Sequence, residues 1–204
     1  MNWPVRLRNW AWVIELSEPI VLFDACVLYP APLRDLLMHL AVAGIFRARW
    51  TEAIHDEWTR NVLKNRPDLR FEQLMRTREL MNAHVLDSLV KGYENLIESI
   101  VLPDPNDRHV LAAAIRSDTK IILTFNIKDI PESSLSPYDI IAISPDIFLV
   151  QCLERAAGNV LKAVRRHRAS LKNPPKSVND YLVTIESNGL KRFVSELRKS
   201  ENNI

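Results

Sequence analysis

The chain is poor in glycine, with four in 204 residues, and each of them stands alone. Without closely spaced glycines, neither G-x-G-x-x-G nor G-x-x-x-x-G-K-[ST] can be formed, which excludes the common loops that bind dinucleotides and nucleoside triphosphates. The patterns G-x-S-x-G and H-E-x-x-H, typical of many serine hydrolases and zinc proteases, are also missing. Any chemistry on phosphate groups would therefore use carboxylate side chains and a metal ion.

Cysteines and long apolar runs are scarce as well. Cys26 and Cys152 are too few for a disulfide framework or a four-thiolate zinc site, and they predict a protein of the reducing cytoplasm. The longest apolar runs, 140–143 and 147–150, are too short to cross a bilayer, so we expect a soluble protein with no membrane partner. The N-terminal residues also lack the apolar core and cleavage site of a signal peptide.

Charge is divided unevenly along the chain. Residues 1–150 hold 16 Lys+Arg against 20 Asp+Glu, a net charge of −4, whereas residues 151–204 hold 11 against 5, a net charge of +6. The overall net charge of +2 is therefore the sum of an acidic body and a basic tail.

Strand and helix patterns alternate through the first three quarters of the chain. Continuous apolar runs predict buried strands, and apolar residues at helical spacing between them predict helices. The predicted strands are 20–23, 45–50, 97–102, 121–124 and 140–143, and the predicted helices are 33–41, 52–64, 69–83, 86–95 and one that starts at Asp104-Pro105. This order predicts an α/β fold with a mainly parallel sheet.

We expect three parts in the chain. Residues 1–19 form an N-terminal arm, whose tryptophans we interpret as packing or partner-binding residues, and residues 20–145 form the α/β domain. A helix starting at Ser144-Pro145-Asp146 opens a basic, all-helical C-terminal extension over residues 146–204. Two further helices are predicted there, from Ser177 to 188 and over 190–199.

Several acidic residues stand where predicted elements begin or end. Asp24 closes the first strand, Asp104 and Asp107 open a helix, and Glu57 lies beside the apolar stripe of its helix. Taken singly, Asp104 can be a helix cap, Asp107 a first-turn residue that suits the helix dipole, and Glu57 a solvated side chain. Because ligands bind beyond the carboxyl ends of parallel strands, these four oxygen donors together predict a Mg²⁺ or Mn²⁺ site.

Four motifs, in order, resemble the PIN-domain ribonucleases, and most closely the VapC-type toxins of toxin–antitoxin pairs. They are Phe23-Asp24-Ala25-Cys26-Val27-Leu28-Tyr29, the helix with Glu57, Asp104-Pro105-Asn106-Asp107-Arg108-His109 and Thr124-Phe125-Asn126-Ile127-Lys128-Asp129. The resemblance covers about residues 20–150 and implies a three-layer α/β/α fold. It also implies Mg²⁺- or Mn²⁺-dependent cleavage of RNA phosphodiesters by a metal-activated water.

Carried over by position, Asp24, Glu57 and Asp107 resemble the principal acids of the family, with Asp104 as a further candidate. Thr124 and Asn126 match its T-x-D/N motif at a strand end and would orient the site. Many PIN domains have Asp where this chain has Asn126, which leaves three or four carboxylates for the metal. The Asn form is familiar in VapC-like members, often with an Asp three residues later, as Asp129 is here.

The basic tail resembles the helical extension of one VapC subgroup. Clustered cations on a helix suit RNA phosphates, so we name the following as RNA-binding candidates, together with Arg108 of the acidic motif: Arg165, Arg166, Arg168 and Lys172. The alternatives are a solvated helix face and a contact with an antitoxin or a second copy of the chain.

The preferred interpretation is a cytoplasmic, metal-dependent endoribonuclease that acts as a toxin, with RNA as substrate, an antitoxin as partner and a homodimer as its assembly. The alternative is an inactive PIN-like module that binds RNA or protein. A metal-dependent phosphatase of the haloacid type fits less well, because such enzymes need a second Asp two residues after the first, and this chain has Cys26 there.

Overall fold

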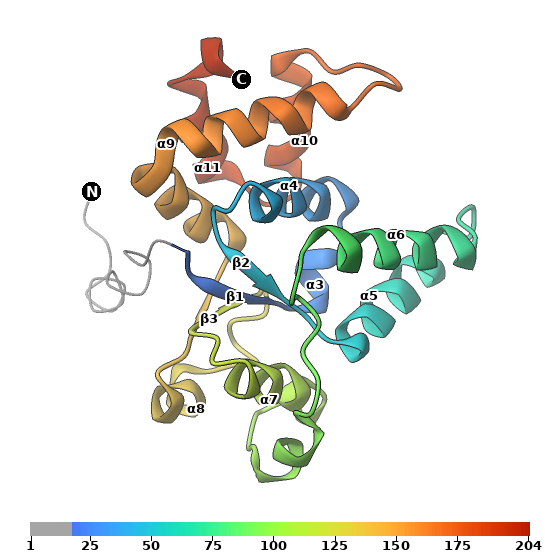
Figure 1. The fold of residues 1–204 in the computed structure, drawn as a ribbon, viewed down its shortest axis with the longest axis vertical. Helices are drawn as coiled ribbons and strands as arrows, with labels where there is room; N and C mark the ends of the chain where they lie inside the picture. Colours follow the sequence, from blue (N-terminus) through green and yellow to red (C-terminus); the bar gives the residue numbers. More distant parts are fainter. Residues whose placement is uncertain (1–17) are drawn as a thin grey trace.

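The computed structural model describes residues 18–204, so the tryptophans of the N-terminal arm lie outside the described residues. A parallel sheet of four strands has the order β2-β1-β3-β4 (Figure 1). The strands are β1 (Ile20–Phe23), β2 (Arg47–Arg49), β3 (Ile121–Leu123) and β4 (Ile141–Ile143). Four of the five predicted strands are therefore confirmed, and their apolar runs are buried because helices cover the sheet.

Helices cover both faces of this sheet, giving the three-layer α/β/α arrangement. In Figure 1, α4 (Ala31–Val42) and α9 (Pro145–Ser170) lie on one side of the strands, and α7 (Arg108–Arg116) and α8 (Glu132–Leu135) lie on the other. The remaining helices are α3 (Ala25–Leu28), α5 (Glu52–Asn65), α6 (Phe71–His84), α10 (Val178–Ser187) and α11 (Lys191–Arg198). Short 3-10 turns are η1 (Glu94–Ser99), η2 (Pro105–Asp107), η3 (Ser136–Tyr138) and η4 (Glu201–Asn203).

The predicted helix at 86–95 and the predicted strand at 97–102 are both wrong. The first segment is extended, because the backbone of Trp50 bonds to Ser88 and Val90 at 2.9 and 2.8 Å, and Asp87 and Gly92 have positive φ. In place of the strand, η1 covers 94–99 and packs against α7. The apolar residues of this segment therefore cover a helix and do not extend the sheet.

The hydrophobic core runs from the sheet into the start of α9. Phe23 on β1 makes an edge contact with Phe46, with 5.9 Å between ring centroids, and Phe46 makes another with Phe148 on α9 at 5.2 Å. The helix is interrupted at Ala156, whose φ of −140° is not helical. As a whole, α9 packs against α4 and α11.

The C-terminal extension is all-helical, and hydrogen bonds join its helix α11 back to the start of α9. The carboxylate of Asp146 accepts hydrogen bonds from the backbone N–H of Arg192 at 3.1 Å and of Phe193 at 2.9 Å. Asp146 therefore satisfies two free N–H groups in the first turn of α11. No helix among residues 18–204 is both long enough and apolar enough to span a membrane.

Candidate active site

Asp24 and Thr124 lie side by side at the carboxyl edge of the two central strands. Phe23 is paired in register with Leu123, and the residue after each is therefore brought to the same edge of the sheet. The Thr124 hydroxyl donates to Asp24 Oδ2 at 2.7 Å, and Asp24 is only 5% exposed. A buried carboxylate needs hydrogen-bond partners, and Thr124 provides one for Asp24.

Cys26 and the loop after Thr124 complete the surroundings of Asp24. The Cys26 thiol donates to Asp24 Oδ2 at 3.1 Å and accepts the backbone N–H of Phe125 at 3.3 Å. Burial, reinforced by the negative charge of Asp24, raises the pKa of Cys26 to about 12, so the thiol stays protonated and can donate. The backbone N–H of Asn126 donates to Thr124 Oγ1 at 2.9 Å, whereas the Asn126 side chain is exposed.

Asp107 stands among four other carboxylates. Burial raises its pKa to about 6, with further contributions from the negative charges of Asp24, Asp104, Asp129 and Glu57. Like charges raise the pKa of a carboxyl only when they are close, so this shift identifies one acidic cluster built from four separate parts of the chain. Asp104 also caps η2, because its Oδ1 accepts the backbone N–H of Asn106 at 2.8 Å.

Glu57 reaches the cluster from α5. Thr51 caps this helix as predicted, since its hydroxyl accepts the backbone N–H of Ile54 at 3.1 Å. Ile54 and Trp58 are buried, and Glu57 between them is half-buried. Its Oε2 lies 3.7 Å from Nε2 of His109, one residue beyond Arg108 on α7. The packing of α5 therefore positions Glu57 beside His109 of α7 at the acidic cluster.

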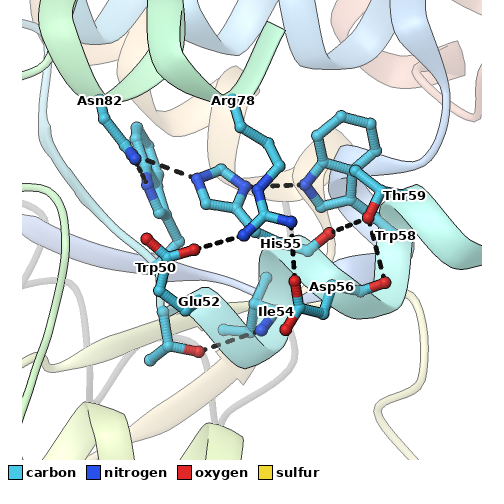
Figure 2. A network of polar contacts seen from close by, with 10 residues as sticks. Trp50, Glu52, Ile54, His55, Asp56, Trp58, Thr59, Arg78 and Asn82 are labelled. Carbon is cyan, nitrogen blue, oxygen red and sulfur yellow. Dashed lines mark hydrogen bonds and ion pairs between the residues drawn. The ribbon is translucent and has the colours of Figure 1, made fainter. Parts of the chain in front are cut away.

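A polar network fixes α5 against α6 and β2 (Figure 2). Asn82 Oδ1 accepts from Trp50 Nε1 at 2.7 Å and lies 3.1 Å from His55 Nε2. Trp58 Nε1 donates to His55 Nδ1 at 2.9 Å, so the His55 proton must lie on Nε2. Figure 2 also shows Arg78 of α6, which pairs with Glu52 and Asp56 of α5. These contacts hold the helix that carries Glu57.

The chemistry of the donor set fits a hard divalent cation, although its side chains are not yet closed around one position. Carboxylate oxygens are the ligands that Mg²⁺ and Mn²⁺ prefer, and burial together with the charges of four neighbouring carboxylates raises the pKa of Asp107. Within residues 18–204, no three His, Cys, Asp or Glu side chains are arranged to hold a metal ion as they stand.

The site candidates from the sequence fall into two groups. Six are found at the acidic site: Asp24, Glu57, Asp104, Asp107, Thr124 and Asn126. Asp129, named only for its spacing after Asn126, belongs to the same cluster. Sequence interpretation missed Cys26 as a partner of Asp24, because a lone thiol gives no signal until the adjacent strand places a loop over it.

The RNA-binding candidates differ in the exposure and the hydrogen bonds of their side chains. Arg165, Arg166 and Lys172 are exposed on the C-terminal extension. Arg168 instead donates to the backbone oxygens of Lys176 at 3.0 Å and Ile204 at 3.3 Å, which joins α9 to the end of the chain. Arg108 is half-buried beside the cluster, and within the described residues its Nε has no hydrogen-bond partner.

Comparison with known families agrees with this fold. The PIN domain family matches residues 20–128 of the 204, which is more than half of the chain, so the protein belongs to the PIN domain family. A second family, described as the VapC50 C-terminal domain, matches residues 145–199.

One curated relative is similar to part of this chain. It is named "Putative ribonuclease VapC50" and comes from Mycobacterium tuberculosis, and it is 44% identical to this chain over 63 residues. That alignment covers 31% of this chain and 37% of the relative, so the chain matches little more than a third of the relative's length. No solved structure matches the chain.

Proposed function

We propose that this protein is a metal-dependent endoribonuclease and the toxin of a toxin–antitoxin pair. Its substrate is RNA, its cofactor is Mg²⁺ or Mn²⁺, and it works in the cytoplasm with a small antitoxin protein as partner and a second copy of the chain as dimer partner. Membership of the PIN family and the similarity to a relative named as a ribonuclease support the activity.

The observation that carries the proposal is the acidic cluster at the carboxyl edge of the parallel sheet. Asp24 is buried there, and the charges of four neighbouring carboxylates contribute to raising the pKa of Asp107 to about 6. A fold gains no stability from such repulsion, and a divalent cation would remove it. The cluster therefore favours a cation-binding catalytic role over a purely structural one.

Each residue has a role that follows from its contacts. Asp24, Glu57, Asp107 and Asp104 would hold the ion, with Asp129 adding negative charge beside them. When bound, the ion would polarise a phosphoryl oxygen and activate water. Thr124 holds Asp24 by its hydroxyl and turns the following loop by accepting the N–H of Asn126. The guanidinium of Arg108, next to Asp107 in the chain and half-buried, is a candidate to bind a phosphate oxygen at the edge of the cluster.

The test is cleavage of a single-stranded RNA by the wild type and by Asp24→Asn and Asp107→Asn. We expect both variants to retain less than about 1% of the wild-type rate, since each removes charge that holds the ion. EDTA should abolish wild-type cleavage, and Mg²⁺ or Mn²⁺ should restore it. Glu72→Gln, which changes an exposed acid on α6, is the matched control and should cleave normally.

Unchanged cleavage by both Asp variants would refute the assignment. Circular dichroism and thermal unfolding test whether both variants fold. We expect Asp24→Asn to fold, because the Asn side-chain oxygen can still accept the hydrogen bonds of Thr124 and Cys26.

The second candidate is an inactive module that binds RNA or protein. It is favoured by Asn126, which stands where many family members have an acid, and by the open arrangement of the carboxylates among residues 18–204. Calorimetric titration with Mn²⁺ separates the two, because a nuclease of this kind should bind Mn²⁺ at millimolar concentration and an inactive module need not.

A further inference from the structure

The turn between α10 and α11 lies against the active-site loop. Gly189 in this turn has φ +91°, and a Cβ placed on it would be 3.2 Å from the nearest ring carbon of Phe125. Phe125 follows Thr124 directly, and its backbone N–H bonds to the thiol of Cys26. The C-terminal extension and the catalytic loop therefore share a surface, although about 60 residues of sequence separate Phe125 from Gly189.

Phe125 presents an aromatic ring to solvent beside the acidic cluster. Its side chain is 40% exposed, even though its backbone is held in place and one edge of its ring rests on Gly189. Leaving part of a large aromatic ring in water costs free energy. A ring that is fixed at its edge and open on the rest of its surface can stack with a nucleic-acid base.

Two cations stand two and three residues after Gly189, at the start of α11. Lys191 and Arg192 are exposed, and among the described residues neither side chain has an ion pair with an acid. The Arg192 main chain is fixed, because its N–H donates to Asp146 at 3.1 Å. RNA is repelled by the carboxylates next to Phe125, so a strand at this site needs positive charge on the adjoining surface.

We propose that Phe125, Lys191 and Arg192 form a contact for single-stranded RNA at the rim of the acidic site. One base stacks on Phe125, and the phosphates that follow it bind Lys191 and Arg192. The C-terminal extension therefore takes part in substrate binding through its α10–α11 turn and not only through the basic face of α9. This inference rests on the proposed ribonuclease function. It adds the surface along which the RNA strand leaves the scissile bond.

The experiment measures binding of a labelled single-stranded RNA by fluorescence anisotropy, with Asp24→Asn as the parent so that no cleavage occurs. Phe125→Ala should weaken binding by about fivefold to a hundredfold and leave its salt dependence unchanged, since stacking involves no counterion. Phe125→Trp, which keeps an aromatic surface, should restore the affinity.

The cationic pair is tested by Lys191→Gln/Arg192→Gln. Losing two phosphate contacts should lower the slope of log affinity against log salt by about 1.4. Lys91→Gln/Arg198→Gln removes the same charge from two exposed cations that are not among the RNA-binding candidates, and it is the matched control. We expect a smaller change in slope from the control pair.

The outcomes distinguish this inference from the proposed function. If the parent does not bind RNA and the wild type does not cut it, the proposed ribonuclease fails. If the wild type cuts and the parent binds, but Phe125→Ala binds as the parent does, the stacking contact is refuted. Equal slopes for the two double variants would show a general charge effect and would also refute the specific contact.

Discussion

At the scale of single residues, Asp24 depends on Thr124. Thr124 is fully buried and serves two partners, because its hydroxyl donates to Asp24 and accepts the N–H of Asn126. Thr124→Val keeps the shape of the side chain and removes both bonds. We expect the free energy of unfolding to fall by about 1–3 kcal/mol in urea denaturation, because a buried carboxylate and a backbone donor each lose a partner.

RNA cleavage should fall with it, since Asp24 is no longer held in one orientation. Thr124→Ser is the control, because serine restores the hydroxyl, and it should recover most of the activity. If valine and serine behaved alike, the hydroxyl would have no role in positioning Asp24.

His167 on α9 is a second residue whose environment makes a prediction. It is buried, and its Nδ1 lies 3.0 Å from the Tyr181 hydroxyl on α10. Burial, and to a lesser degree the charge of His39 on α4, lowers the pKa of His167 to about 4 from its ordinary 6.5. Between these pH values the unfolded chain binds a proton that the folded chain does not.

The free energy of unfolding should therefore fall as the pH drops from 6.5 to 4, by about 1.4 kcal/mol per pH unit from His167 alone. Above pH 6.5 this residue contributes no pH dependence. Urea denaturation of the wild type and of His167→Gln at pH 4.5 to 7.5 measures the effect, and the variant should show the shallower slope. Parallel curves for the two proteins would contradict the prediction.

At the scale of elements, two glycines should respond in opposite ways to alanine. Gly189 has φ +91° at the α10–α11 turn and touches Phe125, whereas Gly158 lies within α9 and a Cβ there would meet nothing within 4 Å. Gly189→Ala should destabilise the protein by about 1–2 kcal/mol. Gly158→Ala should stabilise it by about 0.5–1 kcal/mol. Thermal unfolding measures both, and a neutral Gly189→Ala would show that the turn can relax.

Elements with their own local signal were predicted well. Thr51 caps α5, Ser177 caps α10, and the apolar runs of the four strands are in place. The segment 86–102 was predicted wrongly, because pairing with Trp50 and packing on α7 decide its conformation. Trp50 and α7 both lie outside the segment in sequence. Local periodicity cannot reveal a partner that lies elsewhere in the chain.

At the scale of the whole molecule, a bound cation should stabilise the fold by relieving the repulsion around Asp107. At about 100 times its dissociation constant, Mn²⁺ should add about 2.7 kcal/mol, which corresponds to a rise in Tm of about 5–10 °C for a chain of this size. Asp107→Asn should show a smaller rise, and Glu72→Gln the same rise as the wild type. Equal shifts in wild type and Asp107→Asn would place the ion elsewhere.

The uneven charge of the chain becomes meaningful only in the folded protein. The acidic body contains the cluster around Asp107, and the basic tail contains both the exposed face of α9 and the α10–α11 turn. Composition could not distinguish these two basic surfaces. The contact between Gly189 and Phe125 does so, because it brings one of them to the site.

The sequence by itself determined the parallel α/β fold, the candidate acids and the helical tail, since apolar runs, caps and motif spacing are local properties of the chain. It also indicated Asp24 and Thr124, because each follows a buried strand. Only the tertiary structure decided that Cys26 supports Asp24, that Asp129 joins the cluster, and that Arg168 holds the C-terminus in place. These outcomes depend on strand register and helix packing, which bring together side chains far apart in sequence.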